Sequence, residues 1–381
     1  MKKIIFVSEI CASVQNTNST HILTNCLLDG LCSTGNEIMF VAICGKAEEE
    51  YVRKQYGDKK YNLVLVYKHF FEKFQKYKFL YQIYKYRFFK LPIQKNILRQ
   101  ICSFIDSNTI LISHAPSIES IYFCKNIKKT YSKLRYIQYW SDPIVLSGIL
   151  PEEIGIKRLP LKIIEKYLFT KADEIVFGTR TLWEFQRCLY KKYAAKMRYI
   201  DLPYIVKKET GKFSNPNKKQ IVYSGNYYSD IRNISPLYET MDAFGMEIVL
   251  DIYGLSDLKL DNKKNVFIKG RISPEEIHKV ELNADILVCL LNKKCIQIPG
   301  KIFYNIDIKQ QILIIVDGKY GNKIKEYLKE FNRFVFCDNN IESIKKAITY
   351  ILNDPLAINE DILLKCSPNN IAMELIKKNE N

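Results

Sequence analysis

The chain has 381 residues, of which 47% are hydrophobic and 26% charged, so it is globular in composition and long enough for two domains. It contains no apolar run of about 18 residues or more, which argues against a transmembrane helix. Its 11 cysteines include no CxxC pair and its 4 histidines are scattered, which argues against a metal cluster or a disulfide framework.

The net charge is +17 and is unevenly distributed. Lys and Arg outnumber Asp and Glu by 32 to 17 in residues 1–200, but only by 26 to 24 in residues 201–381. This asymmetry indicates an anionic partner that contacts the N-terminal half.

The N-terminal segment, MKKIIFVSEICAS, has too short an apolar core for a signal peptide, and we expect it to begin a cytoplasmic domain with a strand. Strand-length apolar runs then alternate with helical segments up to residue 206, which predicts a parallel sheet with both faces covered. The expected strands are residues 3–7, 37–42, 63–67, 109–113, 134–139, 174–178 and 198–202. The expected helices are residues 21–32, a helix from about residue 118, 160–170 and 179–189.

Residues 68–90 have an unusual composition, with ten Phe and Tyr, seven Lys and Arg, and one acidic residue. Aromatic residues interleaved with basic ones are typical of helices at the surface of an anionic membrane. The same composition could bind nucleic acid, which we consider the less favoured partner, or could form an aromatic core stripe with a solvated lysine face.

Residues 207–219 are polar, contain Gly and Pro, and are interpreted as a linker. The strand-helix alternation then restarts, which predicts a second domain over residues 220–360 and, in all, an α/β protein with two doubly wound Rossmann-like domains facing a cleft. The expected strands are residues 220–224, 247–253, 265–269, 286–291, 312–316 and 333–336, and residues 342–352 are an expected helix. The tail, residues 361–381, should form a helix over 361–378 that could pack back on the first domain.

One stretch of the second domain, residues 284–318, reads as strand, loop, helix and strand. Pro299 and Gly300 are expected to open the helix, because Pro suits a first helical turn. The backbone amides that follow would face an anion at the carboxyl ends of the strands, and Lys301 would add a positive charge. This is the outline of a diphosphate site; the alternative is an ordinary βαβ unit with a surface lysine.

Five segments of the second domain, in order, carry a family resemblance: VYSGNYYSDIRN, LDIYG, NVFIKGRIS, ADILVCLLN and IPGKIFYNIDIKQQIL. Their order and spacing resemble the donor-binding half of family 4-like retaining glycosyltransferases, which have the GT-B fold. The resemblance covers roughly residues 220–320 well and the N-terminal half only in its layout.

The resemblance implies a set of donor-binding residues. Arg232 and Lys301 would neutralise the diphosphate of a nucleotide-sugar, so that no metal is expected. Gly225 would let the backbone approach the phosphates closely. The other implied donor-binding positions are Gly254, Arg271, Asn292 and Gly300.

This sequence departs from the family at two positions. The family carries two glutamates, one for the donor sugar and one for the ribose hydroxyls, and the matching residues here are Ile296 and Tyr304. Tyr304 could make one hydrogen bond to the ribose, and Asp307, one turn further along, could replace the carboxylate only if the helix were rotated or shifted.

Two residues of the first domain are candidate catalytic residues. His114 follows an expected strand and matches a histidine that faces the donor sugar in related enzymes, although it could instead cap the next helix. Asp142, in the sequence WSDP, could orient or deprotonate an acceptor hydroxyl, although Asp before Pro is also common in turns.

The sequence hypothesis is a glycosyltransferase at the inner face of the membrane, which moves a sugar from a nucleotide-sugar donor to a hydroxyl of a lipid-linked or other glycan acceptor in surface polysaccharide biosynthesis. The resemblance implies that the anomeric configuration is retained and that no cofactor is needed. The alternatives are a nucleotide-sugar epimerase of the same fold and a non-catalytic scaffold in a membrane glycan assembly complex, the latter motivated by the missing glutamates.

Overall fold

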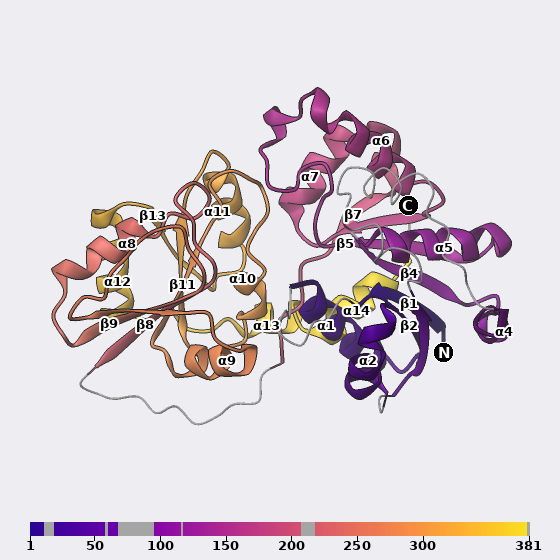
Figure 1. The fold of residues 1–381 in the computed structure, drawn as a ribbon, viewed down its shortest axis with the longest axis horizontal. Helices are drawn as coiled ribbons and strands as arrows, with labels where there is room; N and C mark the ends of the chain where they lie inside the picture. Colours follow the sequence, from indigo (N-terminus) through magenta and orange to yellow (C-terminus); the bar gives the residue numbers. More distant parts are fainter. Residues whose placement is uncertain (11–18, 58–59, 68–94, 116, 207–217, 379–381) are drawn as a thin grey trace. The chain divides into compact units, whose positions relative to one another are not determined.

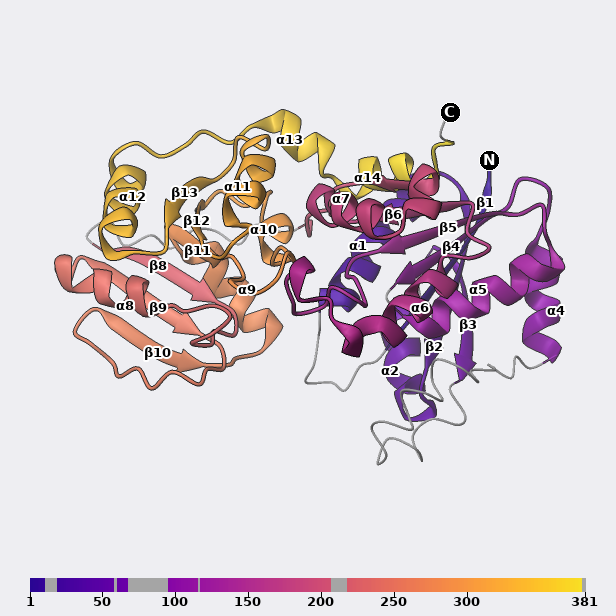
Figure 2. The same cartoon turned by 90° about the horizontal axis from the view of Figure 1, so that it is seen from above.

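The structure, a computed structural model, describes the whole chain except residues 11–18, 58–59, 68–94, 116, 207–217 and 379–381. The described residues form two compact units, each built on its own parallel sheet (Figures 1 and 2). Unit 1 comprises Met1–Ser147, Ile154–Pro203 and Ser367–Asn381, and unit 2 comprises Gly148–Glu153 and Tyr204–Cys366. The prediction of two doubly wound α/β domains is confirmed. The aromatic and basic segment, residues 68–90, lies outside the described residues, as does most of the expected linker.

The sheet of unit 1 has seven strands in the order β3-β2-β1-β4-β5-β6-β7. The strands are β1 Lys3–Glu9, β2 Glu37–Cys44, β3 Asn62–Tyr67, β4 Ile110–Ala115, β5 Arg135–Trp140, β6 Glu174–Phe177 and β7 Met197–Tyr199. All neighbouring strands pair in parallel, and β4 and β6 are buried along their whole length. This burial explains their near-continuous apolar runs, because a parallel sheet is covered on both faces.

Helices cover both faces of this sheet (Figure 2). They are α1 Ser19–Ser33, α2 Glu49–Tyr56, α4 Lys95–Phe104, α5 Ile118–Thr130, α6 Leu159–Leu168, α7 Arg180–Leu189 and the C-terminal α14 Pro368–Ile376, with short 3-10 turns that include η4 Ile156–Arg158. Ser117 caps α5, because its side chain accepts a hydrogen bond from the Ser120 amide.

The sheet of unit 2 has six parallel strands in the order β10-β9-β8-β11-β12-β13. The strands are β8 Lys219–Ser224, β9 Ile248–Tyr253, β10 Val266–Gly270, β11 Ile286–Leu290, β12 Gln311–Val316 and β13 Val335–Asp338. The helices are α8 Ser235–Thr240, α9 Pro274–Asn283, α10 Lys301–Tyr304, α11 Gly321–Lys329, α12 Ile341–Asn353 and α13 Glu360–Lys365. No helix in the described part of the chain combines the length and the apolar character needed to cross a bilayer.

The single helix expected over residues 361–378 is two helices, α13 and α14. The break lies at Ser367 and Pro368: the Ser367 side chain caps α14 by accepting a hydrogen bond from the Asn370 amide, and Pro368 occupies the first turn of that helix. Proline suits this position but breaks a helix interior, which explains the division.

The C-terminal helix α14 belongs to unit 1, where it packs against α1. The backbones meet at Gly30, where a Cβ atom would lie only 2.1 Å from the Pro368 carbonyl oxygen and 3.1 Å from Cβ of Ala372. Glycine at position 30 is therefore required by the close approach of α14.

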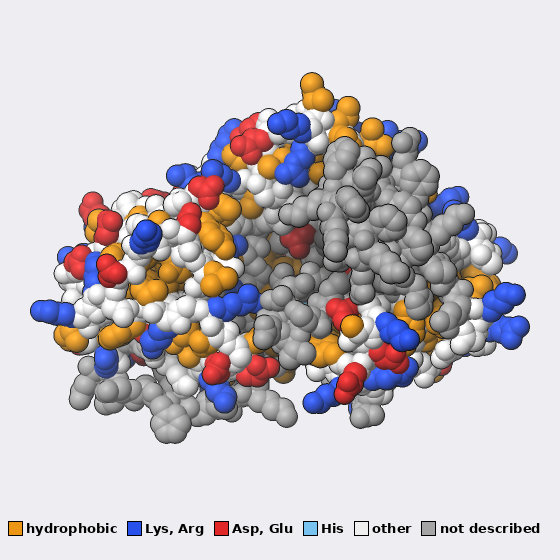
Figure 3. Space-filling model, in the orientation of Figure 1, with side chains coloured by type: hydrophobic (Ala, Val, Ile, Leu, Met, Phe, Trp, Pro, Cys, Tyr) orange, Lys and Arg blue, Asp and Glu red, His pale blue; other side chains and the backbone are white. Residues whose placement is uncertain are grey.

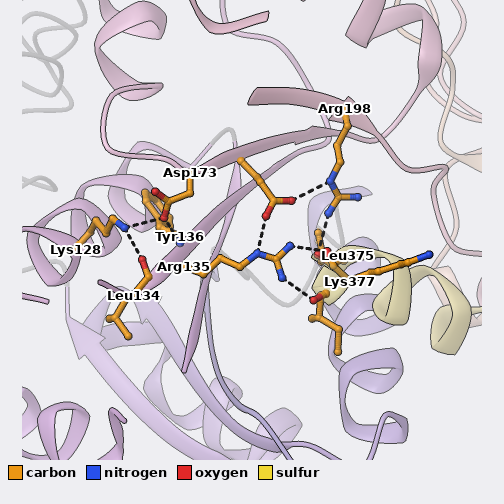
Figure 4. A network of polar contacts seen from close by, with 10 residues as sticks. Lys128, Leu134, Arg135, Tyr136, Asp173, Arg198, Leu375 and Lys377 are labelled. Atoms are coloured by element: carbon orange, nitrogen blue, oxygen red, sulfur yellow. Dashed lines mark hydrogen bonds and ion pairs between the residues drawn. The ribbon is translucent and has the colours of Figure 1, made fainter. Parts of the chain in front are cut away.

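Two arginines of the sheet hold the end of α14 (Figure 4). Arg135 donates to the carbonyls of Ile376 and Lys377, each at 2.6 Å, and Arg198 donates to the carbonyl of Leu375 at 3.0 Å. Both arginines also pair with Glu174, at 2.5 Å and 3.1 Å. Carbonyls at the end of a helix lack partners within it, and here the two guanidinium groups supply donors.

Replacement of Gly30 by alanine should lower the free energy of unfolding by about 1–3 kcal/mol, because the new methyl group would collide with backbone atoms. Urea denaturation followed by circular dichroism measures this loss. Gly155→Ala is the matched control, because a Cβ there meets nothing within 4 Å. Equal stability of the two variants would contradict the proposed fit of α14 against α1.

Candidate functional site

In each sheet the strand order reverses once, between β1 and β4 in unit 1 and between β8 and β11 in unit 2. At such a switch point the connections leave the sheet in opposite directions, and ligands of open α/β proteins bind just beyond the carboxyl ends of the two strands. The predicted site residues Arg232, Asn292 and Lys301 follow β8 and β11, whereas His114 lies near the end of β4. The sequence therefore placed its candidates at both switch points.

Arg232 lies in the loop that follows β8, where a tight turn fixes its backbone. Tyr228 and Arg232 exchange backbone hydrogen bonds of 3.2 Å and 2.9 Å. The Arg232 side chain donates from Nε to Oδ1 of Asn292 at 2.6 Å, and it is also hydrogen-bonded to the Tyr223 side chain. The guanidinium has more N–H donors than these contacts use, so it can still bind an anion.

Asn292 is largely buried, with 7% exposure, and both ends of its side-chain amide are engaged. Its oxygen accepts from Arg232, and its nitrogen donates to the carbonyl of Gln297 at 2.7 Å. Through these two hydrogen bonds Asn292 links Arg232 to the loop after β11.

Lys301 lies at the same switch point, where it contacts Ser224, the last residue of β8. Its ammonium lies 2.8 Å from Oγ of Ser224 and 2.7 Å from Oε1 of Glu281 on α9. The Lys301 side chain is 39% exposed, whereas that of Glu281 is 6% exposed. The Glu281 carboxylate thus binds Lys301 from the buried side, and the exposed part of the Lys301 side chain can contact a ligand.

The short helix α10 provides fewer amides for an anion than the sequence indicated. It has four residues, and the amides of Ile302, Phe303 and Tyr304 already donate to the carbonyls of Pro299 and Gly300. The positive charge at this edge of the sheet therefore comes from the side chains of Arg232 and Lys301.

The two family glutamate positions are occupied by buried side chains. Ile296 is 0% exposed and Tyr304 is 4% exposed. Tyr304 packs on the backbone of Gly300, where a Cβ atom would lie 2.8 Å from its ring. Asp307 lies beyond α10. Burial lowers the pKa of Arg333 to about 10, and the charge of Asp307 acts in the opposite direction. In this arrangement Gly300 allows Tyr304 to pack closely on the backbone.

The glycines of the site have different roles. Gly254 has φ of +139° and lies against the backbone of Gly225, where a Cβ atom would be 2.1 Å from the Gly225 carbonyl oxygen. Gly225 itself would accept a Cβ atom at ordinary contact distance from Tyr223. Gly270 has φ of +65° at the end of β10 and turns the chain to Arg271, which is exposed. The backbone thus requires glycine at position 254, where it allows the ends of β8 and β9 to meet, and favours glycine at position 270.

In unit 1, His114 lies at the switch point with its side chain almost completely buried, at 1% exposure. Its Nδ1 atom is 2.9 Å from Oγ1 of Thr24, which also donates to the Thr20 carbonyl. When the single Thr24 proton goes to the Thr20 carbonyl, His114 donates from Nδ1 to Thr24 and has a lone pair on Nε2. Within the described residues, Nε2 has no hydrogen-bond partner. His114 does not cap the next helix, because Ser117 does so.

Burial, together with a smaller effect of the neighbouring His21, lowers the pKa of His114 from 6.5 to about 3. The imidazole is therefore neutral at physiological pH and can accept a hydrogen bond at Nε2. Asp142 follows β5 at the same edge of this sheet, where its carboxylate accepts a hydrogen bond from the Ser141 hydroxyl at 3.2 Å. The backbone amide of Ser141 donates to the carbonyl of Ala115, at the end of β4, at 3.2 Å.

Reasoning from the sequence did not identify Glu281, Ser224 or Thr24. An acidic residue in a surface helix normally faces water, so only the structure shows that Glu281 points inward to Lys301. Thr24 could have been noticed, because it lies on the apolar face of an expected helix, where a polar side chain needs a buried partner. In the described residues, no group of three or more His, Cys, Asp and Glu side chains could hold a metal ion.

Comparisons of the sequence with family models and with curated proteins give no match. Solved structures match over nearly the whole chain. The lipopolysaccharide outer core galactosyltransferase WaaB is 12% identical, with 97% of this chain and 95% of that chain covered and a TM-score of 0.55. HepE of Anabaena, solved in complex with UDP and glucose, is 10% identical, with 99% and 96% covered and a TM-score of 0.53. The chain has a GT-B fold.

Another GT-B structure, the trehalose-6-phosphate synthase of Burkholderia multivorans, is 9% identical, with 99% of this chain and 93% of that chain covered and a TM-score of 0.55. Identities this low establish the fold alone. The function must therefore be argued from the residues at the two switch points.

Lowering the pH from about 6 to about 4 should destabilise the protein, because the unfolded chain gains a proton at position 114 that the folded chain excludes. The free energy of unfolding should fall by up to about 1.4 kcal/mol for each pH unit. Urea denaturation across this range should show a smaller pH dependence for His114→Gln than for the wild type. His278→Gln is the control, because His278 lies on α9 of unit 2 and its replacement should leave the contribution of His114 in place. An unchanged pH dependence in His114→Gln would mean that His114 is protonated in the folded state.

Proposed function

We propose that this protein is a glycosyltransferase that transfers a sugar from a nucleoside-diphosphate sugar to a hydroxyl group of an acceptor. The observation that carries the proposal is a pair of cationic side chains that follow the two strands flanking the switch point of unit 2: Arg232 in the loop after β8, and Lys301 on α10 after β11. The leaving diphosphate gains negative charge as the bond to the sugar breaks, and fixed cations stabilise that charge.

The two cations are positioned by different means. Asn292 and Tyr223 orient the guanidinium of Arg232, whereas Glu281 and Ser224 hold the ammonium of Lys301. Because these supports are already in place, little rearrangement is needed when the diphosphate binds. Glu281 also neutralises Lys301 in the absence of ligand, so the diphosphate would share this lysine with the carboxylate.

In unit 1, we assign His114 the role of accepting a hydrogen bond from a sugar hydroxyl at Nε2. A neutral imidazole with one free lone pair suits this role better than general acid catalysis, because its pKa is lowered to about 3. Asp142 is proposed to orient or deprotonate the acceptor hydroxyl.

Four further features of this activity are proposed. They are retention of the anomeric configuration, a lipid-linked or other glycan acceptor, a role in surface polysaccharide biosynthesis, and a position at the inner face of the membrane with residues 68–90 at the lipid surface. Gly225, Gly254 and Arg271 would border the nucleotide, and a hydrogen bond from Tyr304 to the ribose would require its buried side chain to move.

The proposal is tested by measuring turnover of a panel of nucleotide-sugars with the full chain and a lipid-linked acceptor. Arg232→Ala and Lys301→Met should each lower turnover about a hundredfold, because each removes a charge that stabilises the leaving group. Lys293→Met is the control, since Lys293 is exposed in the same loop. The double variant Glu281→Gln/Lys301→Met removes the cation without leaving a buried carboxylate unpaired.

Turnover that survives both Arg232→Ala and Lys301→Met would show that the assigned site is wrong. NMR of a nucleotide-sugar with the protein alone separates transfer from epimerisation, because an epimerase changes the sugar without an acceptor. Calorimetry that detects no binding of any nucleoside diphosphate would favour the non-catalytic scaffold instead, which the buried Ile296 and Tyr304 also motivate.

We further propose that the diphosphate is neutralised by side chains without a metal ion. Treatment with EDTA should then leave turnover unchanged, because Arg232 and Lys301 supply the charge. Activity that EDTA abolishes, and that added Mg²⁺ or Mn²⁺ restores, would contradict this part of the proposal.

A further inference from the structure

A row of apolar side chains faces outward on η4 and α6 of unit 1. Ile156 is 90% exposed, Leu159 52%, Ile163 62% and Tyr167 46%. These residues are spaced three and four apart, which places them along one side of the helix. Elsewhere in the described residues, the exposed large apolar side chains form no comparable series at this spacing.

The buried residues of α6 are a glutamate and Leu168. Its glutamate, Glu165, is 0% exposed and accepts hydrogen bonds from the amide of Ile144 at 2.8 Å and the hydroxyl of Tyr190 at 2.7 Å. Burial raises the pKa of the Glu165 carboxyl group above its ordinary value, although the hydrogen bonds from these donors act in the opposite direction. A buried acidic group with fixed partners sets the rotation of the helix, so the apolar row is held outward by the structure.

Basic side chains accompany the apolar row. Between Gly155 and Lys171 the sequence has five basic residues, and its only acidic residue is the buried Glu165. The basic residues are Lys157, Arg158, Lys162, Lys166 and Lys171. Figure 3 shows hydrophobic and basic side chains next to one another along the upper edge of the molecule, where Figure 1 labels α6. We call this surface, from Ile156 to Lys171, the α6 face.

The charge and side-chain types of the α6 face select one kind of partner. A second copy of the chain would bring five more positive charges to the same surface and be repelled. Nucleic acid is bound by aromatic side chains that stack on bases, whereas three of the four exposed apolar residues here are aliphatic. Aliphatic side chains beside lysines match the boundary between acyl chains and anionic headgroups.

We propose that the α6 face docks on an anionic lipid bilayer. Ile156, Leu159 and Ile163 insert among the acyl chains, while the flanking lysines lie at the level of the headgroup phosphates. Tyr167 suits the same boundary, because its ring is apolar and its hydroxyl is polar. This surface is separate from residues 68–90 and does not depend on the proposed glycosyl transfer, since lipid binding needs neither donor nor acceptor.

The test is flotation of the full-length protein with vesicles of phosphatidylcholine, with and without phosphatidylglycerol. The wild type should float only with the anionic vesicles. Ile156→Ser/Ile163→Ser should weaken binding about tenfold or more, because it removes the side chains that insert. Met246→Ser/Met373→Ser is the control, since both methionines are about as exposed as Leu159 but lie elsewhere, at 54% and 53%.

A second pair of variants tests the charges. Lys157→Gln/Lys166→Gln should weaken binding about tenfold and reduce its dependence on salt, whereas the exposed pair Lys279→Gln/Lys345→Gln should not. Circular dichroism confirms that each variant is folded. The proposal is overturned if the wild type does not float, or if it binds both vesicle types equally. It is also overturned if substitutions in residues 68–90 abolish flotation while the α6 variants bind normally.

Discussion

Parallel pairing brings the carboxyl ends of all strands of a sheet to one edge, and this constraint determines where the protein can bind a ligand. In each sheet the order reverses once, so two adjacent strands at the centre are followed by loops that diverge. In unit 2 these loops carry Arg232 and Lys301, and in unit 1 the corresponding strand end carries His114. Each residue is distant in sequence from its partners, and the sheet alone brings them together. The chemistry proposed here therefore depends on strand order before it depends on any one side chain.

The sequence was sufficient for the fold because apolar runs of strand length, separated by helical segments, leave little choice but a covered parallel sheet. It also identified Arg232 and Lys301, because each follows a strand end. The sequence does not show which partners these side chains have or how they pack. Whether Lys301 is paired depends on the direction in which Glu281 points from α9, and whether Tyr304 can reach a ligand depends on its packing against Gly300. Both are set by tertiary packing, which no spacing of residues reveals.

Buried acidic groups recur as anchors in this structure. Glu281 holds Lys301, Glu165 fixes the rotation of α6, and Glu174 links the two arginines that hold α14. In each case the carboxylate is buried, and a cation or an apolar surface lies between it and the solvent. A buried charge with a full set of partners contributes little net stability but strongly favours one arrangement. We infer that these glutamates specify the positions of the exposed groups that do the binding.

The clamp of Arg135 and Arg198 on the end of α14 also has a consequence for the order of synthesis. Unit 1 is assembled from both ends of the chain, with the whole main body of unit 2 between them. On the ribosome, residues 368–376 emerge only after all six strands of unit 2. Until then the groove beside Gly30 is empty and the face of α1 that α14 covers is open to water. Unit 2 can thus fold during translation, whereas unit 1, although made first, is completed last.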